Sequence, residues 1–447
     1  MATVALRARA PGAVSANVVE LGDRSVVFVE ADASERLGAL SATASENLAL
    51  AARVARTEKL PLVGVIASSG ADLIEGVAAL HGWGVAARAI ADCSGIVPII
   101  LAVTGPAVSG PALLLGLADI VIMTKDAYAF VSGPTMVAEF TGVVVGNEEL
   151  GGADAHARHS GAAHLIVADR GAAIAAIEEL LVYLPNHTDD EPPFWPTDDP
   201  SDRSVPEAGA ALPATATGSY DVRNVIRAVV DDGELLELRA RWAPNLVTAF
   251  ATIAGRAVGI VANQPLAIAG TLDIPASQKG ARFVETCDAF NLAILTFVDT
   301  PGFYPGKDLE WRGMIRHGAQ LVFAYGRATV PRISVILRKS YGGAYIVMDS
   351  KRMGNDLCLA WPTAEIAVMG AGQASAILMR RASPQEKADF EADYTERLLN
   401  PYIAAERGYI DAVIDPADTR RVIAAGLEML HTKRERLAPR KHDNGPL

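Results

Sequence analysis

The chain has 447 residues, of which half are apolar and 21% are charged, and this composition excludes an intrinsically disordered protein. Its 40 basic and 52 acidic side chains give a net charge of −12, which argues against nucleic acid and anionic membranes as partners. The cysteines Cys93, Cys287 and Cys358 form no C-x-x-C pair. We therefore expect neither a zinc ribbon nor a disulfide framework, and we expect a reducing, cytoplasmic location.

The uncharged stretch 93–118 is a candidate membrane span. It contains Pro98, Pro106 and Pro111 and lacks Lys or Arg anchors at its edges. A buried strand, a glycine loop and a buried helix would give the same pattern, so we expect no membrane span. The first residues carry Arg7 and Arg9 and are not expected to form a secretory signal.

Apolar strand-like runs alternate with amphipathic helical runs in two blocks, which is typical of α/β architecture. Residues 44–59 predict a helix, because apolar residues recur at helical spacing. Residues 183–213 are rich in Pro, Asp and Ser and predict a linker between domains 1–182 and 214–447. The expected strands are, in chain order, 25–30, 62–67, 96–103, 119–123, 257–262, 293–299, 332–338 and 365–369.

The two blocks share a spacing of residues. In each block a Val-Pro pair begins an apolar run, and thirteen residues after its valine comes a glycine of a small-residue turn, Gly110 in the first block and Gly343 in the second. Gly70 precedes Gly110 by forty residues, and Gly302 precedes Gly343 by forty-one. This parallel spacing predicts a duplicated domain.

Glycine-rich turns between a strand and a helix direct free peptide N–H groups at whatever lies above them. The stretches 104–113 (TGPAVSGPAL) and 340–345 (SYGGAY) predict two such turns, which suit an anion or a developing oxyanion. Glycine can instead serve only the close packing of a helix on a strand. Neither stretch contains G-x-G-x-x-G or G-x-x-x-x-G-K-[ST], so the sequence predicts no dinucleotide or nucleoside triphosphate site.

Other constellations are weaker. The histidines His156, His159 and His164, with Asp154, lack the i, i+4 spacing of a helical metal site, and we predict no metal. No G-x-S-x-G elbow is present. The isolated cysteines are interpreted as core thiols. The chain therefore offers peptide dipoles and little acid–base machinery.

The second half resembles the carboxyltransferase (β) subunit of biotin-dependent acyl-CoA carboxylases of the propionyl-/acetyl-CoA type. The similarity is nearly continuous from about residue 214 onward. The matching stretches are Tyr220-Asp221-Val222, Val229–Asp232, Gly255-Arg256, Gly259, Asn263-Gln264-Pro265, Leu272-Asp273, Lys279–Val284, CDAFN at 287–291, DTPGFYPG at 299–306, Arg316-His317-Gly318, Lys339–Tyr345, Trp361-Pro362, Ala364–Gly370, Asn400–Gly408 and the ending RKHDNGPL.

The first half is similar but departs from the family at two places. The family usually has Ser-Gly-Gly-Ala-Arg where residues 68–72 read SSGAD, and Gly-Gly-Ala where residues 109–111 read SGP. Asp72 in place of arginine would repel a phosphate-bearing ligand if that site touches one. Pro111 lacks an N–H, whereas Ser109 and Gly110 keep theirs.

The resemblance implies two tandem crotonase-like domains of the ClpP/crotonase superfamily. It implies that the first domain receives the acyl-CoA thioester and the second receives biotin. Because the chain has no Met-Lys-Met biotinylation site and no ATP-binding motif, carboxybiotin must come from a separate biotin carboxylase and biotin carboxyl carrier subunit. In the family the active site lies where the first domain of one subunit meets the second domain of another, commonly in a hexamer.

The resemblance also implies site residues. The oxyanion donors are the peptide N–H groups of Gly343 and Ala344 for the biotin oxygen, and of Ser109 and Gly110 for the thioester oxygen. Ile346 matches a family position that shapes the acyl pocket and should favour apolar acyl chains, short or extended, although it could equally be a core helix residue. The remaining substrate-binding residues are Ser69, Gly70, Ala71, Gly302, Phe303 and Tyr345.

Three functions follow. The favoured one is a biotin-dependent acyl-CoA carboxyltransferase. The second is a biotin-independent decarboxylase, or a carboxyltransferase for an unusual or carrier-bound acyl substrate, which the changed turns at 68–72 and 109–111 motivate. The third is a non-catalytic partner subunit. The glycines retained at both turns argue against the third function, and the intact second-half motifs argue against the second.

Overall fold

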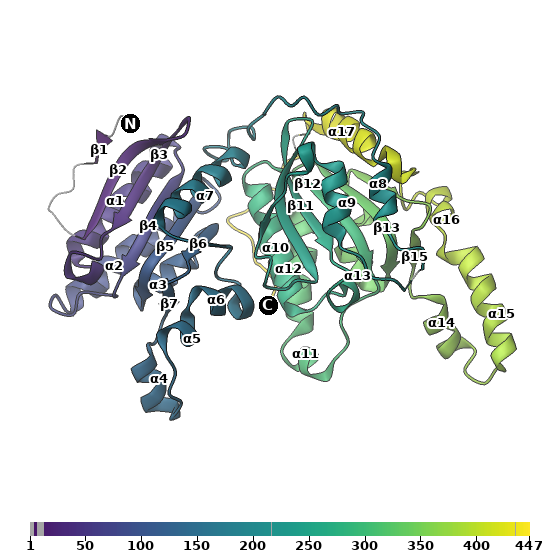
Figure 1. The fold of residues 1–447 in the computed structure, drawn as a ribbon, viewed down its shortest axis with the longest axis horizontal. Coiled ribbons are helices and arrows are strands. Elements are labelled where there is room, and N and C mark those ends of the chain that lie inside the picture. Colours follow the sequence, from purple (N-terminus) through teal and green to yellow (C-terminus); the bar gives the residue numbers. More distant parts are fainter. Residues whose placement is uncertain (1–3, 7–12, 216, 434) are drawn as a thin grey trace. The chain divides into compact units, whose positions relative to one another are not determined.

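A computed structural model describes residues 4–6, 13–215, 217–433 and 435–447. The chain divides into two compact units, and both appear in Figure 1. The first contains the described residues through Pro193, together with Arg239–Trp242 and Ala289–Asn291. The second contains Phe194–Leu238, Ala243–Asp288 and Leu292–Leu447 without the undescribed positions.

The first unit is built on a mixed sheet with the strand order β1-β2-β3-β4-β5-β6-β8, and β7 pairs with β5 beyond the main path. The strands from β3 to β8 pair in parallel, whereas β1 and β2 join the edge antiparallel. The strand bounds are β1 Val4–Ala5, β2 Val14–Leu21, β3 Arg24–Ala31, β4 Leu62–Ser68, β5 Ile99–Val108, β6 Ile120–Thr124, β7 Tyr128–Phe130 and β8 Leu165–Val167.

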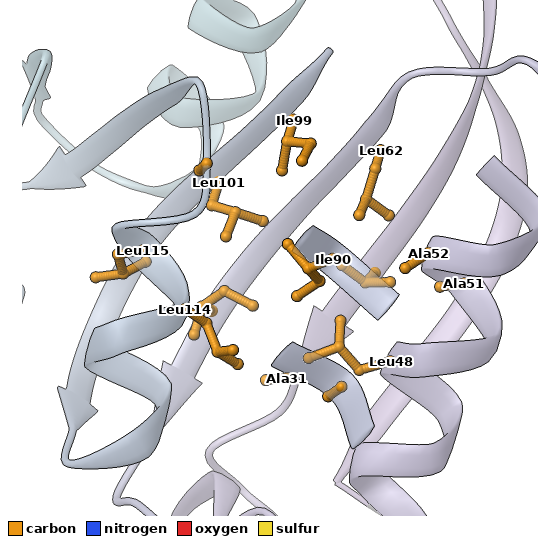
Figure 2. Close-up of a cluster of buried hydrophobic side chains, with 14 of the residues drawn as sticks. Ala31, Leu48, Ala51, Ala52, Leu62, Ile90, Ile99, Leu101, Leu114 and Leu115 are labelled. Atoms are coloured by element: carbon orange, nitrogen blue, oxygen red, sulfur yellow. The ribbon is translucent and has the colours of Figure 1, made fainter. Parts of the chain in front are cut away.

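Three helices of the first unit supply the side chains of one core layer. Ser41 caps the first of them by accepting a hydrogen bond from the N–H of Ala44, and alanines on its buried face allow close approach to the sheet. Figure 2 shows these side chains meeting those of β4 and β5. The three helices are α1 Ala42–Glu58, α2 Val77–Ala91 and α3 Gly110–Leu115. The other helices of the first unit are α4 Pro134–Thr141, α5 Asn147–Gly151, α6 Ala153–Ala155 and α7 Arg170–Tyr183.

The second unit has a sheet of the same kind, ordered β16-β14-β13-β12-β11-β10-β9, with β15 paired to β13. Its strands are β9 Leu236–Leu238, β10 Leu246–Ile253, β11 Arg256–Asn263, β12 Ala293–Thr300, β13 Arg332–Tyr341, β14 Leu357–Ala360, β15 Glu365–Ala367 and β16 Ala412–Val413. Its helices are α8 Pro206–Ala210, α9 Val222–Val229, α10 Ile274–Ala289, α11 Lys307–Trp311, α12 Met314–Arg327, α13 Gly342–Val347, α14 Ala371–Leu378, α15 Pro384–Tyr394, α16 Pro401–Glu406 and α17 Thr419–Leu430.

The two sheets repeat one another strand for strand, so the duplicated domain predicted from spacing is present. β4 and β5 take the places of β12 and β13, and β7 pairs off β5 as β15 pairs off β13. Even an isolated bridge is repeated, because Leu40 pairs with Ala71 in the first unit and Leu272 with Phe303 in the second. All eight predicted strands and the predicted helix occur, with ends shifted by a few residues.

The expected linker 183–213 is divided between the units. From Phe194 onward it packs with the second unit, where the Trp195 N–H donates to the Gly255 carbonyl at 2.8 Å and Arg203 pairs with Asp199 at 2.6 Å. Its proline and aspartate residues therefore make caps, turns and ion pairs instead of solvated coil. Among the described residues, no helix combines the length and apolar character needed to cross a membrane.

Candidate active site at two pairs of turns

In each unit, two neighbouring parallel strands end in turns at the same edge of the sheet. The second-unit turns are residues 300–304, after β12, and residues 341–345, after β13. Gly302 and Gly342 have φ values of 145° and 61°, which side chains disfavour. Gly343 is exposed, and as an early residue of α13 its N–H has no partner within the helix. These turns therefore present peptide donors to solvent.

A buried polar network anchors the second-unit turns from below. The Asp299 carboxylate accepts hydrogen bonds from Tyr220 Oη at 2.8 Å, Arg338 Nε at 3.1 Å and the Lys339 N–H at 3.0 Å. Burial, and then the nearby Asp299 carboxylate, raises the pKa of Tyr220, so its hydroxyl stays protonated and remains a donor. Because Asp299 precedes Thr300 and Arg338 lies near the end of β13, the network ties both turns together.

The first-unit turns are residues 68–72, after β4, and residues 109–112, after β5. Gly70 has φ 115°, and its carbonyl accepts the N–H of Leu40 at 2.8 Å. Gly302 accepts the N–H of Leu272 in the same way at 3.1 Å. The Ser69 N–H is engaged by the Leu37 carbonyl at 3.0 Å, a hydrogen bond that Pro301, at the equivalent place in the second unit, cannot donate.

The turn after β5 differs from its counterpart in its donors. Ser109 has φ 61°, as Gly342 does, so Gly110 corresponds to Gly343 and Pro111 to Ala344. Pro111 has no N–H. The Ser109 N–H donates to the Phe130 carbonyl of β7 at 2.9 Å. Of the two peptide donors assigned here from the sequence, only Gly110 is therefore left outside the sheet's hydrogen bonds.

Asp72 is not an isolated negative charge. Its carboxylate is buried, accepts the Ile74 N–H at 2.9 Å and pairs with Arg36 at 2.6 Å. These two hydrogen bonds, the Ile74 one first, hold the pKa of Asp72 below its usual range. The Arg36 guanidinium is more than half exposed, so the expected repulsion of a phosphate is offset by a cation that pairs with this turn from residues 36–38.

Different aromatic side chains lie against the two glycines. A Cβ placed on Gly110 would come within 2.7 Å of Trp83 Nε1, whereas a Cβ on Gly343 would meet Phe303 Cε2 at 3.7 Å. Trp83 belongs to α2 and packs on the core of the first unit. A Cβ on Gly110 would thus clash with Trp83, while a Cβ on Gly343 would make an ordinary van der Waals contact with Phe303.

Tyr345 and Ile346 follow the second-unit turn and differ in exposure. Tyr345 is buried, and burial raises the pKa of its hydroxyl, so it stays neutral. Ile346 is 41% exposed, so the interpretation of it as a core helix residue is wrong. Its side chain can contact a ligand.

A small apolar cavity lies in the first unit between the sheet and helices α1, α2 and α3. Its volume is about 20 Å³, which is room for about one water-sized group. An acyl chain cannot be accommodated there without moving side chains. The cavity is lined by Val14, Ala31, Leu40, Leu48, Ile66, Ser68, Ile90, Leu101, Pro111, Leu114 and Leu115, several of which are visible in Figure 2.

The other titratable candidates have structural partners. The Nδ1 of His164 accepts the Val121 N–H at 3.0 Å, and His156 bonds the Ser160 hydroxyl and the Ala129 carbonyl, each at 2.7 Å. No group of three metal-ligating side chains occurs among the described residues. The three thiols are free and buried. Burial raises the pKa of Cys93 and of Cys358 to about 11, so neither is a thiolate at neutral pH.

Sequence reasoning missed three contributors to these turns: Trp83, Arg36 and the network around Asp299. Asp299 directly precedes the Thr-Pro-Gly turn, and this polar residue at the end of an apolar strand was an available signal. Trp83 and Arg36 carried no such signal, because only the folded chain brings them to Gly110 and Asp72.

Comparisons with known proteins agree with this geometry. The family described as "Carboxyl transferase domain" matches residues 3–445. The chain is 43% identical over 429 residues to the propionyl-CoA carboxylase beta chain of Saccharopolyspora erythraea, covering 92% of this chain and 79% of that protein. It is 43% identical over 404 residues to the methylmalonyl-CoA decarboxylase subunit alpha of Veillonella parvula, covering 89% and 79%.

A solved structure is similar throughout. It is the transcarboxylase 12S hexamer with methylmalonyl-coenzyme A and methylmalonic acid bound, at a TM-score of 0.95 and 41% identity, covering 97% of this chain and 85% of that one. The family match spans nearly the whole length, and the structural match covers 97% of this chain. The chain therefore belongs to the carboxyl transferase domain family and is a carboxyltransferase built from two crotonase-like domains.

Proposed function

We propose that this chain is the carboxyltransferase component of an acyl-CoA carboxylase, of the propionyl-CoA/methylmalonyl-CoA type. It moves a carboxyl group from carboxybiotin to the α-carbon of an acyl-CoA thioester. The observation that carries this proposal is the repeated pair of turns, each with an N–H-bearing glycine, Gly110 and Gly343, after the same strand. We assign the acyl-CoA to domain 1–182 and biotin to domain 214–447.

The second-unit turns suit the biotin ring. When bound, carboxybiotin supplies the carboxyl group. The N–H groups of Gly343 and Ala344 hold the oxygen of the biotin ring. Phe303 lies beside Gly343, and a Cβ on Gly302 would meet no atom within 4 Å, so a planar ring has room between them. The Asp299 network keeps both turns in place, so the donors are oriented before the ligand arrives.

The first-unit turns suit the thioester. Loss of the α-proton to the decarboxylated biotin places negative charge on the thioester oxygen, and the Gly110 N–H donates to that oxygen. A fixed donor of this kind in a dry site is worth several kcal/mol. Because the Ser109 N–H is engaged by Phe130, we retain Gly110 and not Ser109 as the peptide donor. Ser69, Gly70 and Ala71 line the same turn.

The acyl group is limited in two ways. The cavity of about 20 Å³ that Pro111 helps to line is too small for a long acyl chain. Exposed Ile346 offers an apolar edge and no hydrogen bond, which disfavours polar acyl groups by about 1–3 kcal/mol. We propose a short apolar acyl group such as propionyl.

We further propose a homo-oligomer, as in the hexameric structure to which the chain is similar. Both units expose large apolar side chains, which suits burial between subunits. Examples are Leu73, Ile74, Phe140, Val144, Trp311 and Ile315. Light scattering on the purified protein tests this assembly, and a monomer at micromolar concentration would contradict it. Three free thiols support a reducing, cytoplasmic location.

Labelled bicarbonate tests the activity. The protein is mixed with a biotin carboxylase, its carrier subunit and ATP, and label is followed into a panel of acyl-CoAs. In parallel, loss of malonyl-CoA and methylmalonyl-CoA is measured without biotin. We expect biotin- and ATP-dependent labelling of short acyl-CoAs. Loss of carboxylated thioester without biotin would instead identify a decarboxylase. The absence of a reaction in both arms would overturn the proposal.

A further inference from the structure

We propose that the buried ion pair between Arg332 and Asp349 positions α13, and with it the Gly343 and Ala344 N–H groups, so that carboxyl transfer requires an ionised Asp349. The inference rests on the proposed function, because it takes these N–H groups as the donors to biotin. It adds to the site two positioning residues that act only through α13.

The pair closes the segment of chain that carries the donors. Arg332 is the first residue of β13, and Asp349 lies two residues beyond the end of α13. Arg332 Nη1 donates to Asp349 Oδ1 at 2.7 Å, and the two side chains are 3% and 0% exposed. The turn with Gly343 and Ala344 lies between them in the chain. One ion pair therefore joins the start of the strand to the end of the helix.

The helix that carries the donors is short. α13 has six residues, which is less than two turns, and a helix of this length is not stable by itself. The Met348 N–H donates to the Ala344 and Tyr345 carbonyls, each at 3.2 Å, so the end of the helix is tied directly to a donor residue. Asp349 comes next with φ 58°, a left-handed conformation that most side chains disfavour. Whatever holds Asp349 in this conformation also holds α13.

Neighbouring elements fix the pair in turn. Asn355 Nδ2 donates to Asp349 Oδ2 at 2.7 Å, so each carboxylate oxygen accepts a hydrogen bond. The Arg332 guanidinium also donates to the Tyr325 carbonyl of α12 at 2.7 Å and to the Met353 carbonyl at 3.2 Å. Loss of the charge on Asp349 would leave this guanidinium buried without its counter-charge.

The first unit shows that the fold does not need the pair. Ile99 of β5 takes the place of Arg332, because the N–H of each donates to an aspartate at 2.9 Å. Gly116 takes the place of Asp349, because each stands six residues after the glycine assigned as a donor. The same strand, turn and six-residue helix form there without the two charges. We therefore assign the charges to the biotin-side chemistry and not to folding.

The charge on Asp349 depends on pH. Burial raises its pKa to about 6, against the opposing effects of Arg332 and Asn355. This pKa is higher than in the unfolded chain, where it is about 3.9. Protonation near pH 6 therefore removes the charge that pairs with Arg332 without making the folded protein less stable. The other titratable groups that face Asp349 are Asp356, Lys433, Tyr325 and Cys358.

Carboxyl transfer from methylmalonyl-CoA to free biotin tests the pair. This reaction yields propionyl-CoA and carboxybiotin and needs no biotin carboxylase, whose own pH dependence would interfere. In the wild-type protein we expect kcat to fall about tenfold from pH 7 to pH 5, as the ionised fraction of Asp349 falls. KM for methylmalonyl-CoA should change little, because this substrate is assigned to the first unit. The melting temperature should not follow kcat.

Asp349→Asn keeps the shape of the side chain and removes its charge. We expect kcat at pH 7 to be at least about tenfold below the wild-type value and to be the same at pH 5. The matched control is Asp231→Asn, which breaks an equally buried pair of the second unit, between Arg420 and Asp231 at 2.6 Å. It should lower the melting temperature but leave kcat at pH 7 and its fall toward pH 5 unchanged.

Three results would overturn the proposal: a wild-type kcat that is equal at pH 5 and pH 7, wild-type kcat in Asp349→Asn, or an Asp349→Asn variant whose kcat still falls toward pH 5. If Asp349→Asn fails to fold, Arg332→Ile/Asp349→Gly takes its place, because it installs the residues of the first unit and leaves no unpaired charge. Its kcat should be low and independent of pH, and wild-type kcat there would also refute the role. A wild-type protein that transfers no carboxyl group to biotin would refute the proposed function instead.

Discussion

Gly70 and Gly302 follow equivalent strands with φ values of 115° and 145°, and each carbonyl accepts a hydrogen bond from an equivalent leucine. The residues directly before Ser68 and Thr300, which begin these two turns, differ, however. Asp299 in the second unit carries three hydrogen bonds, whereas the equivalent position in the first unit is Ala67. The two turns share a backbone and differ in what supports them.

The first unit supports its turn from the outside. Arg36, which is more than half exposed, holds Asp72 at 2.6 Å, and the Leu37 carbonyl receives the Ser69 N–H. In this pair Asp72 is buried but Arg36 is exposed, and water screens such a pair more than it screens a fully buried network. The comparison therefore indicates that duplication kept the peptide geometry that the chemistry needs, while the anchoring residues diverged.

The largest expected effect is on the donors of the second-unit turns. Gly343→Val fits sterically at Cβ, where the nearest atom is 3.7 Å away, but its branches enter the space for the ligand. We expect carboxyl transfer to fall by at least 10²-fold, as for loss of an oxyanion donor, with an unchanged melting temperature. Retained activity would remove Gly343 from the site.

The next effect concerns the buried anchor. Asp299→Asn leaves Arg338 buried without its counter-charge, and we expect the second unit to lose about 3 kcal/mol in urea unfolding. The control is Asp308→Asn, because Asp308 is 77% exposed and its loss should change stability by less than about 0.5 kcal/mol. Equal effects of the two variants would contradict the network's role.

The anchor of the first unit should respond to acid. The pKa of Asp72 is lower in the folded protein than in the unfolded chain, where it is about 3.9. Its stabilisation is therefore complete above that value and is lost as pH falls through the folded pKa. We expect Asp72→Asn to destabilise the protein at pH 7 and much less at pH 3. A loss that is the same at both pH values would rule out the ionised pair.

The smallest effect lies within α2, next to Trp83. A Cβ on Gly84 meets no atom within 4 Å, so Gly84→Ala should stabilise the protein by about 0.5–1 kcal/mol through helix propensity. Gly82→Ala should destabilise it, since the new Cβ would lie 2.9 Å from Ala42 Cα. Thermal melts of both variants check this pair. A change in melting temperature of the same sign in both would contradict the packing of α2 on α1.

Much of the fold could be predicted because it depends on local patterns. Apolar runs bounded by Gly and Pro placed every predicted strand, although β5 begins at Ile99, after Pro98, because the proline has no N–H for the ladder. Among the strands that were not predicted are Val14–Leu21, Leu246–Ile253 and Leu357–Ala360. The segment 183–213 is divided between the two units, because proline and aspartate suit turns packed on a domain as well as free coil.

The site was predicted only in its backbone. The order of glycines identified both turns, and family motifs assigned Gly110 and Gly343; these assignments remain predictions. The occupied Ser109 N–H was not predictable, because its partner Phe130 lies on another strand. The same is true of the exposure of Ile346.

The sequence by itself determined the duplicated α/β plan and the positions of the glycine turns, because these depend on periodicity, spacing and backbone conformation along the chain. Its motifs indicated the family by resemblance. Only the tertiary structure decided which donors stay free, which charges pair and which ring lies over each glycine. Trp83 meets Gly110, Arg36 meets Asp72 and Arg338 meets Asp299 across separations of 27 or more residues. Contacts of that kind depend on how strands and helices pack, which no local pattern encodes.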